Sequence, residues 1–136
     1  MRTVKHGVID RSPEGDDGVI LVWVALMLVA LVGMGALAMF GSGGVEVEGL
    51  KDVAFGLAPL TDEEAAYMLN STWAGRKLRG FRNLRPTDGA AARSVLRHLA
   101  QLAADVPELA ELEINPLRVL APGQGAFALD TRLRVR

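Results

Sequence analysis

Cysteine is absent from all 136 residues, which excludes disulfides, thiolate catalysis and zinc–thiolate sites. Histidine is scarce, and the only two, His6 and His98, lie too far apart in the sequence to indicate a histidine-rich metal site. An excess of one charge sign is also lacking, because the formal net charge is −1. The overall charge therefore gives no reason to expect a nucleic-acid partner.

A long apolar run is the most conspicuous feature that is present. From Val19 to Phe40 there is no charged or strongly polar side chain. As a helix this run would extend about 33 Å, which matches the hydrocarbon core of a bilayer, and it is apolar on all sides. We therefore expect a charged leader at 1–18 and a transmembrane-type helix at 19–40. Lys and Arg are more frequent before the run than after it, which predicts a single-pass membrane protein with a cytoplasmic N-terminus.

Two alternatives for the apolar run stay open. The run could be a helix buried in a protein core, although few residues remain to cover it on every side. It could also belong to a cleaved signal peptide, because Ala36–Ala38 fits the small-x-small cleavage pattern.

Residues 41–136 have the signals of a small α+β unit. An alternating strand is expected at 45–48, and a second strand at 52–57. Thr61 and Glu64 form a capping-box pattern, which predicts a helix from Asp62 to about Asn70. The basic stretch 73–85 is expected to be irregular. The longest helix should begin after Pro86–Asp88 and end near 105–107, with Leu96, Leu99, Ala100 and Ala103 on its apolar face and His98 exposed.

A hairpin is predicted for the last part of the chain. Strands at 111–120 and 125–135 flank a Pro122–Gly123 turn, so paired residue numbers should add up to about 245. Asn115 then faces Asp130 on the same side of the sheet, with Cβ atoms about 5 Å apart. An amide oxygen beside a carboxylate suits a hard cation such as Mg²⁺. A simple Asn–Asp hydrogen-bonded pair is the alternative.

Gly41, Gly43 and Gly44 form a glycine-rich loop before the first of these strands. Such loops can bring backbone N–H groups close to phosphate, but most are ordinary turns. Neither the lysine of a Walker A loop nor the third glycine of a dinucleotide fingerprint follows.

The segment Glu14–Ala38 resembles the N-terminal anchor of TadE/TadG-type pilus-assembly proteins. That resemblance implies a membrane-anchored structural or pilus-assembly protein, with the remaining residues as an attached domain. It also implies a junction between two unlike pieces near Ala38–Met39.

Four ordered blocks resemble a different family, and they are Met39–Leu60, Gly80–Arg82, Ala110–Leu117 and Ala128–Asp130. Together they are similar to the C-terminal part of the ATP-grasp domain of NDP-forming acyl-CoA synthetases, such as ADP-forming acetate–CoA ligases and succinyl-CoA synthetase β subunits. The resemblance implies a partial ATP-grasp fold, an antiparallel sheet with flanking helices, over 41–136.

The same resemblance implies a set of site residues. Asn115 and Asp130 would bind the Mg²⁺ of ATP or ADP, and Gly43, Gly44, Glu48 and Arg82 would contact the nucleotide. Ser42 and Gly56 depart from the family, which usually has an apolar residue and an arginine at these positions. The upstream half of the family's domain, with its nucleotide-binding lysine, has no counterpart in these blocks.

Three functions follow from these expectations. The first is a part of an acyl-CoA synthetase, cytoplasmic as in the family, that works with a CoA-binding subunit or domain and is not active alone. The second is the membrane-anchored protein, attached through 19–40. The third is a generic small α/β binding module without Mg²⁺ dependence.

Overall fold

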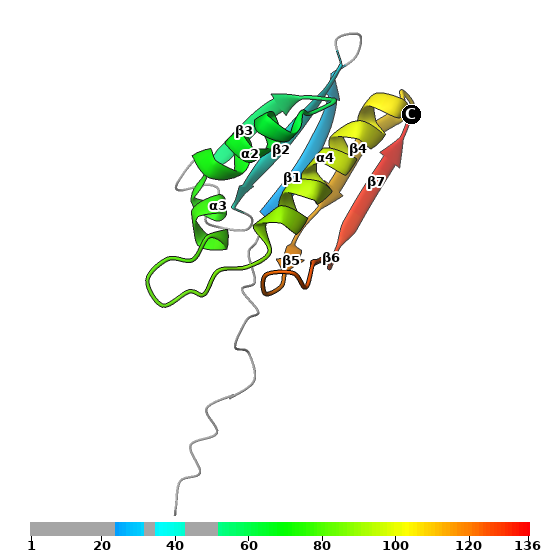
Figure 1. The fold of residues 1–136 in the computed structure, drawn as a ribbon. Helices are drawn as coiled ribbons and strands as arrows, with labels where there is room; N and C mark the ends of the chain where they lie inside the picture. Colours follow the sequence, from blue (N-terminus) through cyan, green and yellow to red (C-terminus); the bar gives the residue numbers. More distant parts are fainter. Residues whose placement is uncertain (1–23, 32–34, 43–51) are drawn as a thin grey trace, which may run out of the picture.

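The chain folds as a five-stranded antiparallel sheet with helices on one face (Figure 1). The structure is a computed structural model, and it describes residues 24–31, 35–42 and 52–136. The strand order is β3–β2–β1–β4–β7, and β5 and β6 form a separate two-stranded sheet. The elements are, in chain order, β1 (Val24–Leu31), β2 (Gly35–Ser42), β3 (Val53–Leu57), α2 (Asp62–Ser71), α3 (Trp73–Leu78), α4 (Gly89–Asp105), β4 (Leu109–Ile114), β5 (Leu117–Val119), β6 (Ala126–Ala128) and β7 (Thr131–Val135).

The described part of the apolar run, residues 24–31 and 35–40, forms two strands, so the prediction of a transmembrane-type helix at 19–40 is wrong. Within the run, β1 and β2 pair antiparallel from Val24↔Ser42 to Leu31↔Gly35, and β1 also pairs with β4. Gly35 has a φ of +99°, a conformation that glycine adopts without strain. Both strands consist of small or apolar residues without the alternating polar residues of a half-exposed strand, which is why the run had the hydropathy of a membrane helix.

No helix among the described residues is long and apolar enough to cross a membrane. The expected membrane attachment through 19–40 depended on such a helix, so it is not supported. The cellular location stays a prediction. The charged leader at 1–18 lies outside the described residues, as does the expected strand at 45–48.

The core lies between the sheet and the helix layer. Alternate residues of β2, namely Ala36, Ala38 and Phe40, are buried, and Ala38 and Phe40 have no exposed surface. From α4, Ala92, Leu96 and Ala100 pack into the same cluster, with Leu99 and Ala103 at its margin. The predicted apolar face of this helix is confirmed, and His98 is exposed as expected.

Local capping signals placed two of the helices correctly. The Thr61 hydroxyl accepts from the Glu64 N–H, and the Glu64 carboxylate accepts from the Thr61 N–H, which completes the predicted capping box of α2. Asp88 caps α4 by accepting from the Ala91 N–H. The expectation that 73–85 is wholly irregular is wrong, because α3 occupies its first part and is capped by Thr72.

The C-terminal hairpin has the predicted register. Leu112 pairs with Leu133, Ile114 with Thr131, and Leu117 with Ala128. Each predicted strand is divided in two: Asn115 and the cis-bonded Pro116 separate β4 from β5, and Leu129 and Asp130 separate β6 from β7. Backbone hydrogen bonds continue through the break, so the two short ladders share one register.

Candidate functional site

The face of the sheet that carries no helices, here called the open face, is charged at its β4–β7 end. Leu112 and Ile114 are buried against the helix layer, so strand alternation places Glu111 and Glu113 on the open face. Their cross-strand partners are Arg134 and Arg132. Directly opposite residues project to the same side, so acidic and basic side chains face each other on adjacent strands.

Asn115 and Asp130 lie next along this face. The Asn115 N–H donates to the Asp130 carbonyl oxygen at 3.0 Å, and the Leu129 N–H donates to the Pro116 carbonyl oxygen at 3.1 Å. Together with Glu113 and Arg132, the pair lines a small pocket of about 150 Å³. The structure confirms that Asn115 and Asp130 lie opposite each other, as predicted.

The donor atoms of this pocket fit a divalent cation. Asn115 Oδ1 is buried and has no hydrogen-bond partner among the described residues, although its Nδ2 donates to Glu113 Oε1 at 3.3 Å. A buried carbonyl oxygen without a donor is costly unless something else occupies it. The described residues contain no cluster of three or more His, Cys, Asp or Glu, so this site offers few protein ligands. Mg²⁺ commonly binds through one or two protein oxygens, water and substrate phosphates.

Asp88 attaches the hairpin that carries this pocket to the helix layer. Its carboxylate accepts from the Ala91 N–H at 2.9 Å and from the Gly125 N–H at 3.0 Å, and its own N–H donates to the Leu120 carbonyl oxygen. These backbone donors hold the pKa of Asp88 below its usual range. The start of α4 and the β5–β6 turn are therefore joined through one ionised side chain.

Asp52 has a structural role at the other end of the fold. Its carboxylate accepts from the Trp73 N–H at 2.6 Å and the Ala74 N–H at 3.0 Å, which caps α3, and from the Ser42 hydroxyl at 2.7 Å. Partial burial raises the pKa of Asp52, but the Ser42 hydroxyl and the backbone donors outweigh it, so the pKa is lower than usual. Ser42, an apolar position in the resembled family, thus has a defined partner.

Arg82 is not brought to the pocket. It lies on the loop after α3 with a φ of 53°, is exposed, and places its guanidinium 5.2 Å from the centre of the Phe81 ring. Gly43, Gly44 and Glu48 lie outside the described residues. The nucleotide contacts expected of these four residues stay predictions. The residues that sequence reasoning missed are Glu113 and Arg132, which the pairing sum of 245 would have placed beside Asn115 and Asp130.

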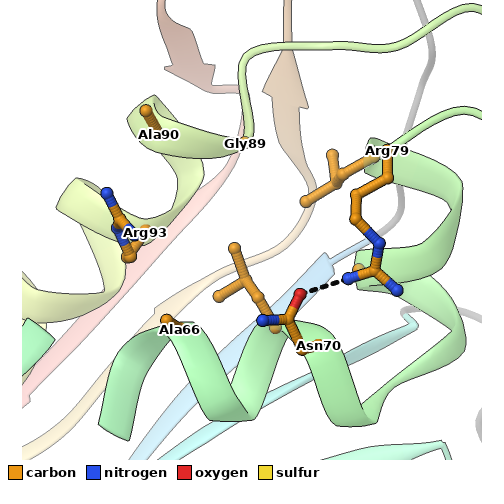
Figure 2. Close-up of a pocket in the computed structure, with 9 residues that line it drawn as sticks. Ala66, Asn70, Arg79, Gly89, Ala90 and Arg93 are labelled. Atoms are coloured by element: carbon orange, nitrogen blue, oxygen red, sulfur yellow. Dashed lines mark hydrogen bonds between the residues drawn. The ribbon is translucent and has the colours of Figure 1, made fainter. Parts of the chain in front are cut away.

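A larger pocket lies among the three helices (Figure 2). It has a volume of about 270 Å³ and an apolar floor that includes Leu69 and Leu78. Arg79 donates to the Asn70 side chain at its rim, and Arg93 pairs with Asp62. No carboxylate is among the residues that line it, so it offers no cation site.

The described residues thus form a one-sided helix layer over an antiparallel sheet, with an amide–carboxylate pair on the open face whose oxygens suit a hard divalent cation. A family model described as "ATP-grasp domain" matches residues 27–135, and the chain belongs to this family.

Similar proteins narrow the comparison further. The β subunit of acetate–CoA ligase (ADP-forming) I from Pyrococcus furiosus is 34% identical over 140 residues, which covers 97% of this chain and 60% of that subunit. The 4-hydroxybutyrate–CoA ligase (ADP-forming) of Nitrosopumilus maritimus is 42% identical over 101 residues, covering 74% of this chain and 14% of the ligase. The chain therefore spans only part of the length of these relatives.

A solved structure has the same fold. It is the dinucleotide forming acetyl-coenzyme A synthetase 1 of Ca. Korarchaeum cryptofilum, in complex with coenzyme A and Mg-AMPPCP, with its phosphohistidine segment pointing towards the nucleotide binding site. Its TM-score to this chain is 0.77 at 32% identity, and the match covers 85% of this chain and 53% of that one.

These matches remove the expected junction at Ala38–Met39. The family match begins at residue 27, inside the apolar run, and β2 continues across the junction from Gly35 to Ser42. The alignment with the Pyrococcus furiosus subunit covers nearly the whole chain. The resemblance to a TadE/TadG-type anchor is not supported, because residues 24–31 and 35–38 of the segment that carried it are strands of the ATP-grasp sheet.

Proposed function

We propose that this chain supplies the Mg²⁺·nucleotide-binding part of an ATP-grasp, NDP-forming acyl-CoA synthetase. The whole enzyme would catalyse acid + CoA + ATP ⇌ acyl-CoA + ADP + phosphate. The observation that carries the proposal is the pairing of Asn115 with Asp130 on the open face, with a buried, unpartnered Asn115 Oδ1. The family match and the ADP-forming ligases among its relatives support it.

In this proposal the chain's own residues position the metal. Asp130 supplies a carboxylate and Asn115 an amide oxygen, both fixed by the shared hairpin register. Glu113 accepts from the Asn115 amide nitrogen, which turns the amide oxygen away from Glu113. Mg²⁺, when bound there with the nucleotide, neutralises phosphate charge during phosphoryl transfer.

The proposed partners are a nucleotide, ATP or ADP, and a CoA-binding subunit or domain. The phosphoryl acceptor and the CoA site would come from that partner. The Korarchaeum enzyme binds coenzyme A and has a phosphohistidine segment that points towards its nucleotide binding site. Gly43, Gly44, Glu48 and Arg82 are proposed as further nucleotide contacts.

Calorimetric titration with ADP in the presence and absence of Mg²⁺ tests the proposal. We expect binding that depends on Mg²⁺ and that falls about ten-fold or more in Asp130→Asn, which loses the negative charge and one carboxylate oxygen, and in Asn115→Ala, which loses its amide oxygen. Asp105→Asn makes the same chemical change at the far end of α4 and should bind as the parent does. ADP binding that is equal with and without Mg²⁺, or equal in Asp130→Asn and Asp105→Asn, would count against the proposal.

A further inference from the structure

The pocket on the open face contains one cationic side chain as well as its oxygen ligands. Arg132 lines it together with Glu113, Asn115 and Asp130. A cation next to a proposed metal site repels the metal, because like charges raise the free energy of a bound ion. The presence of Arg132 therefore needs an explanation that a bare metal site does not give.

The neighbouring rung of the same hairpin shows what an ordinary pairing looks like here. Arg134 faces Glu111 across the strands and forms an ion pair at 3.2 Å. One rung further along the same face, Arg132 faces Glu113. Arg132 and Glu113 form no ion pair, and the Glu113 carboxylate accepts instead from the Asn115 amide at 3.3 Å.

Two opposite charges are consequently left available in one small pocket. Among the described residues, neither the Arg132 guanidinium nor the Asp130 carboxylate has a hydrogen-bond or ion-pair partner, whereas Arg134 and Glu111 have each other. A carboxylate and amide oxygen beside a guanidinium match a ligand that contains both a cation and an anion. A divalent metal with a phosphate group bound to it has that pattern, and the planar guanidinium fork matches phosphate oxygens.

We propose that Arg132 is a phosphate-binding residue, so that this pocket takes a metal–phosphate pair and not a free metal ion. The inference rests on the proposed function and assigns to Arg132 a phosphate group of the Mg²⁺·nucleotide. Asn115 and Asp130 would hold the metal, and Arg132 would contact a phosphate group bound to it. Removal of the guanidinium should then have opposite effects on the two kinds of ligand.

The test compares Mn²⁺ alone, followed by its electron paramagnetic resonance signal, with pyrophosphate titrated calorimetrically at saturating Mg²⁺. In Arg132→Gln we expect Mn²⁺ alone to bind a few-fold more tightly, because a repulsive charge is gone. Pyrophosphate should bind about ten-fold more weakly or worse, because a charge-assisted hydrogen bond is lost. Arg132→Lys should recover part of the pyrophosphate affinity. Arg134→Gln, on the same strand and face but outside the pocket, should change neither affinity.

Arg132 is exposed on an edge strand, so these variants should keep the fold, which the thermal midpoint and circular dichroism check directly. The inference is overturned if Arg132→Gln shifts both affinities in the same direction, or leaves Mg²⁺-dependent pyrophosphate binding unchanged. The proposed function itself fails if Mn²⁺ and Mg²⁺·pyrophosphate bind the parent chain no more tightly than they bind the Asp130→Asn variant.

Discussion

Asn115 and Asp130 lie directly opposite each other, and the N–H of Asn115 donates to the Asp130 carbonyl oxygen at 3.0 Å. This contact lies between the β4–β7 and β5–β6 ladders, which share the same register. The two side chains are thus positioned by main-chain pairing on both sides. A metal site built on such a frame has its oxygen donors in place before the ligand arrives.

The Asp52 carboxylate should be a main contributor to the stability of the α3 region. Replacement by alanine leaves the Trp73 and Ala74 N–H groups and the buried Ser42 hydroxyl without their acceptor. We expect Asp52→Ala to lower the free energy of unfolding by about 2 kcal/mol. Urea denaturation measures the change. Asp105→Ala removes an exposed carboxylate at the end of α4 and should change stability by less than about 0.5 kcal/mol; equal effects of both variants would argue against the capping role.

Acid should destabilise the fold through the same group. The pKa of Asp52 is lowered in the folded chain, so its contribution is present above the unfolded pKa of about 3.9 and is lost as the pH falls through the folded value. The parent chain should therefore lose stability below about pH 4. Unfolding midpoints in urea between pH 6 and pH 2 should fall less steeply in Asp52→Asn than in the parent. A slope that is unchanged in Asp52→Asn would show that other carboxylates account for the acid sensitivity.

Asp88 should control the order of the β5–β6 turn. In Asp88→Ala the Gly125 and Ala91 N–H groups both lose their acceptor, with an expected cost of about 1–2 kcal/mol. Hydrogen exchange at both amides should accelerate, and Asp88→Asn should restore protection at one of them, because it keeps a single carbonyl oxygen. Protection at Gly125 that survives in Asp88→Ala would disprove the link between α4 and the turn.

Gly75 should resist substitution because α3 packs closely on the end of α2. A Cβ atom at this position would overlap the Leu69 carbonyl oxygen, which is main chain and has little freedom to move. We expect Gly75→Ala to destabilise by about 2 kcal/mol or more. Gly89→Ala is the matched control, since a Cβ there meets no atom within 4 Å and alanine favours helix. Thermal unfolding should separate the two variants clearly, and similar midpoints would contradict the close packing.

The parts of the fold that were predictable from sequence depend on local signals. Thr61 with Glu64 located the start of α2, and Asp88 located the start of α4. The Pro122–Gly123 turn and the alternation in β7 fixed the register that brings Asn115 to Asp130. Each of these signals acts over a few residues or one turn, so no knowledge of the rest of the chain was needed.

The parts that failed depend on contacts between distant residues. The run from Val19 to Phe40 has the hydropathy of a membrane helix, and only its pairing with β3 and β4 distinguishes two interior strands from that helix. Gly35, the first residue of β2, was the available sign that a single helix does not continue through the run. For α3, the adjacent Thr72 was a local cap signal that was missed, whereas the second cap lies 21 residues earlier in the chain, at Asp52, where no local pattern indicates it.

The position of the metal–nucleotide site is tested most directly by paramagnetic broadening of amide signals. Substoichiometric Mn²⁺·ADP, added to the ¹⁵N-labelled chain, should first broaden the signals of Glu113, Asn115, Asp130 and Arg132 on the open face. The signals of Ala66 and Gly89, in the pocket between the helices, should stay sharp at the same Mn²⁺ level. Early broadening around the helix pocket, or broadening that is uniform over the chain, would contradict a metal site at Asn115 and Asp130.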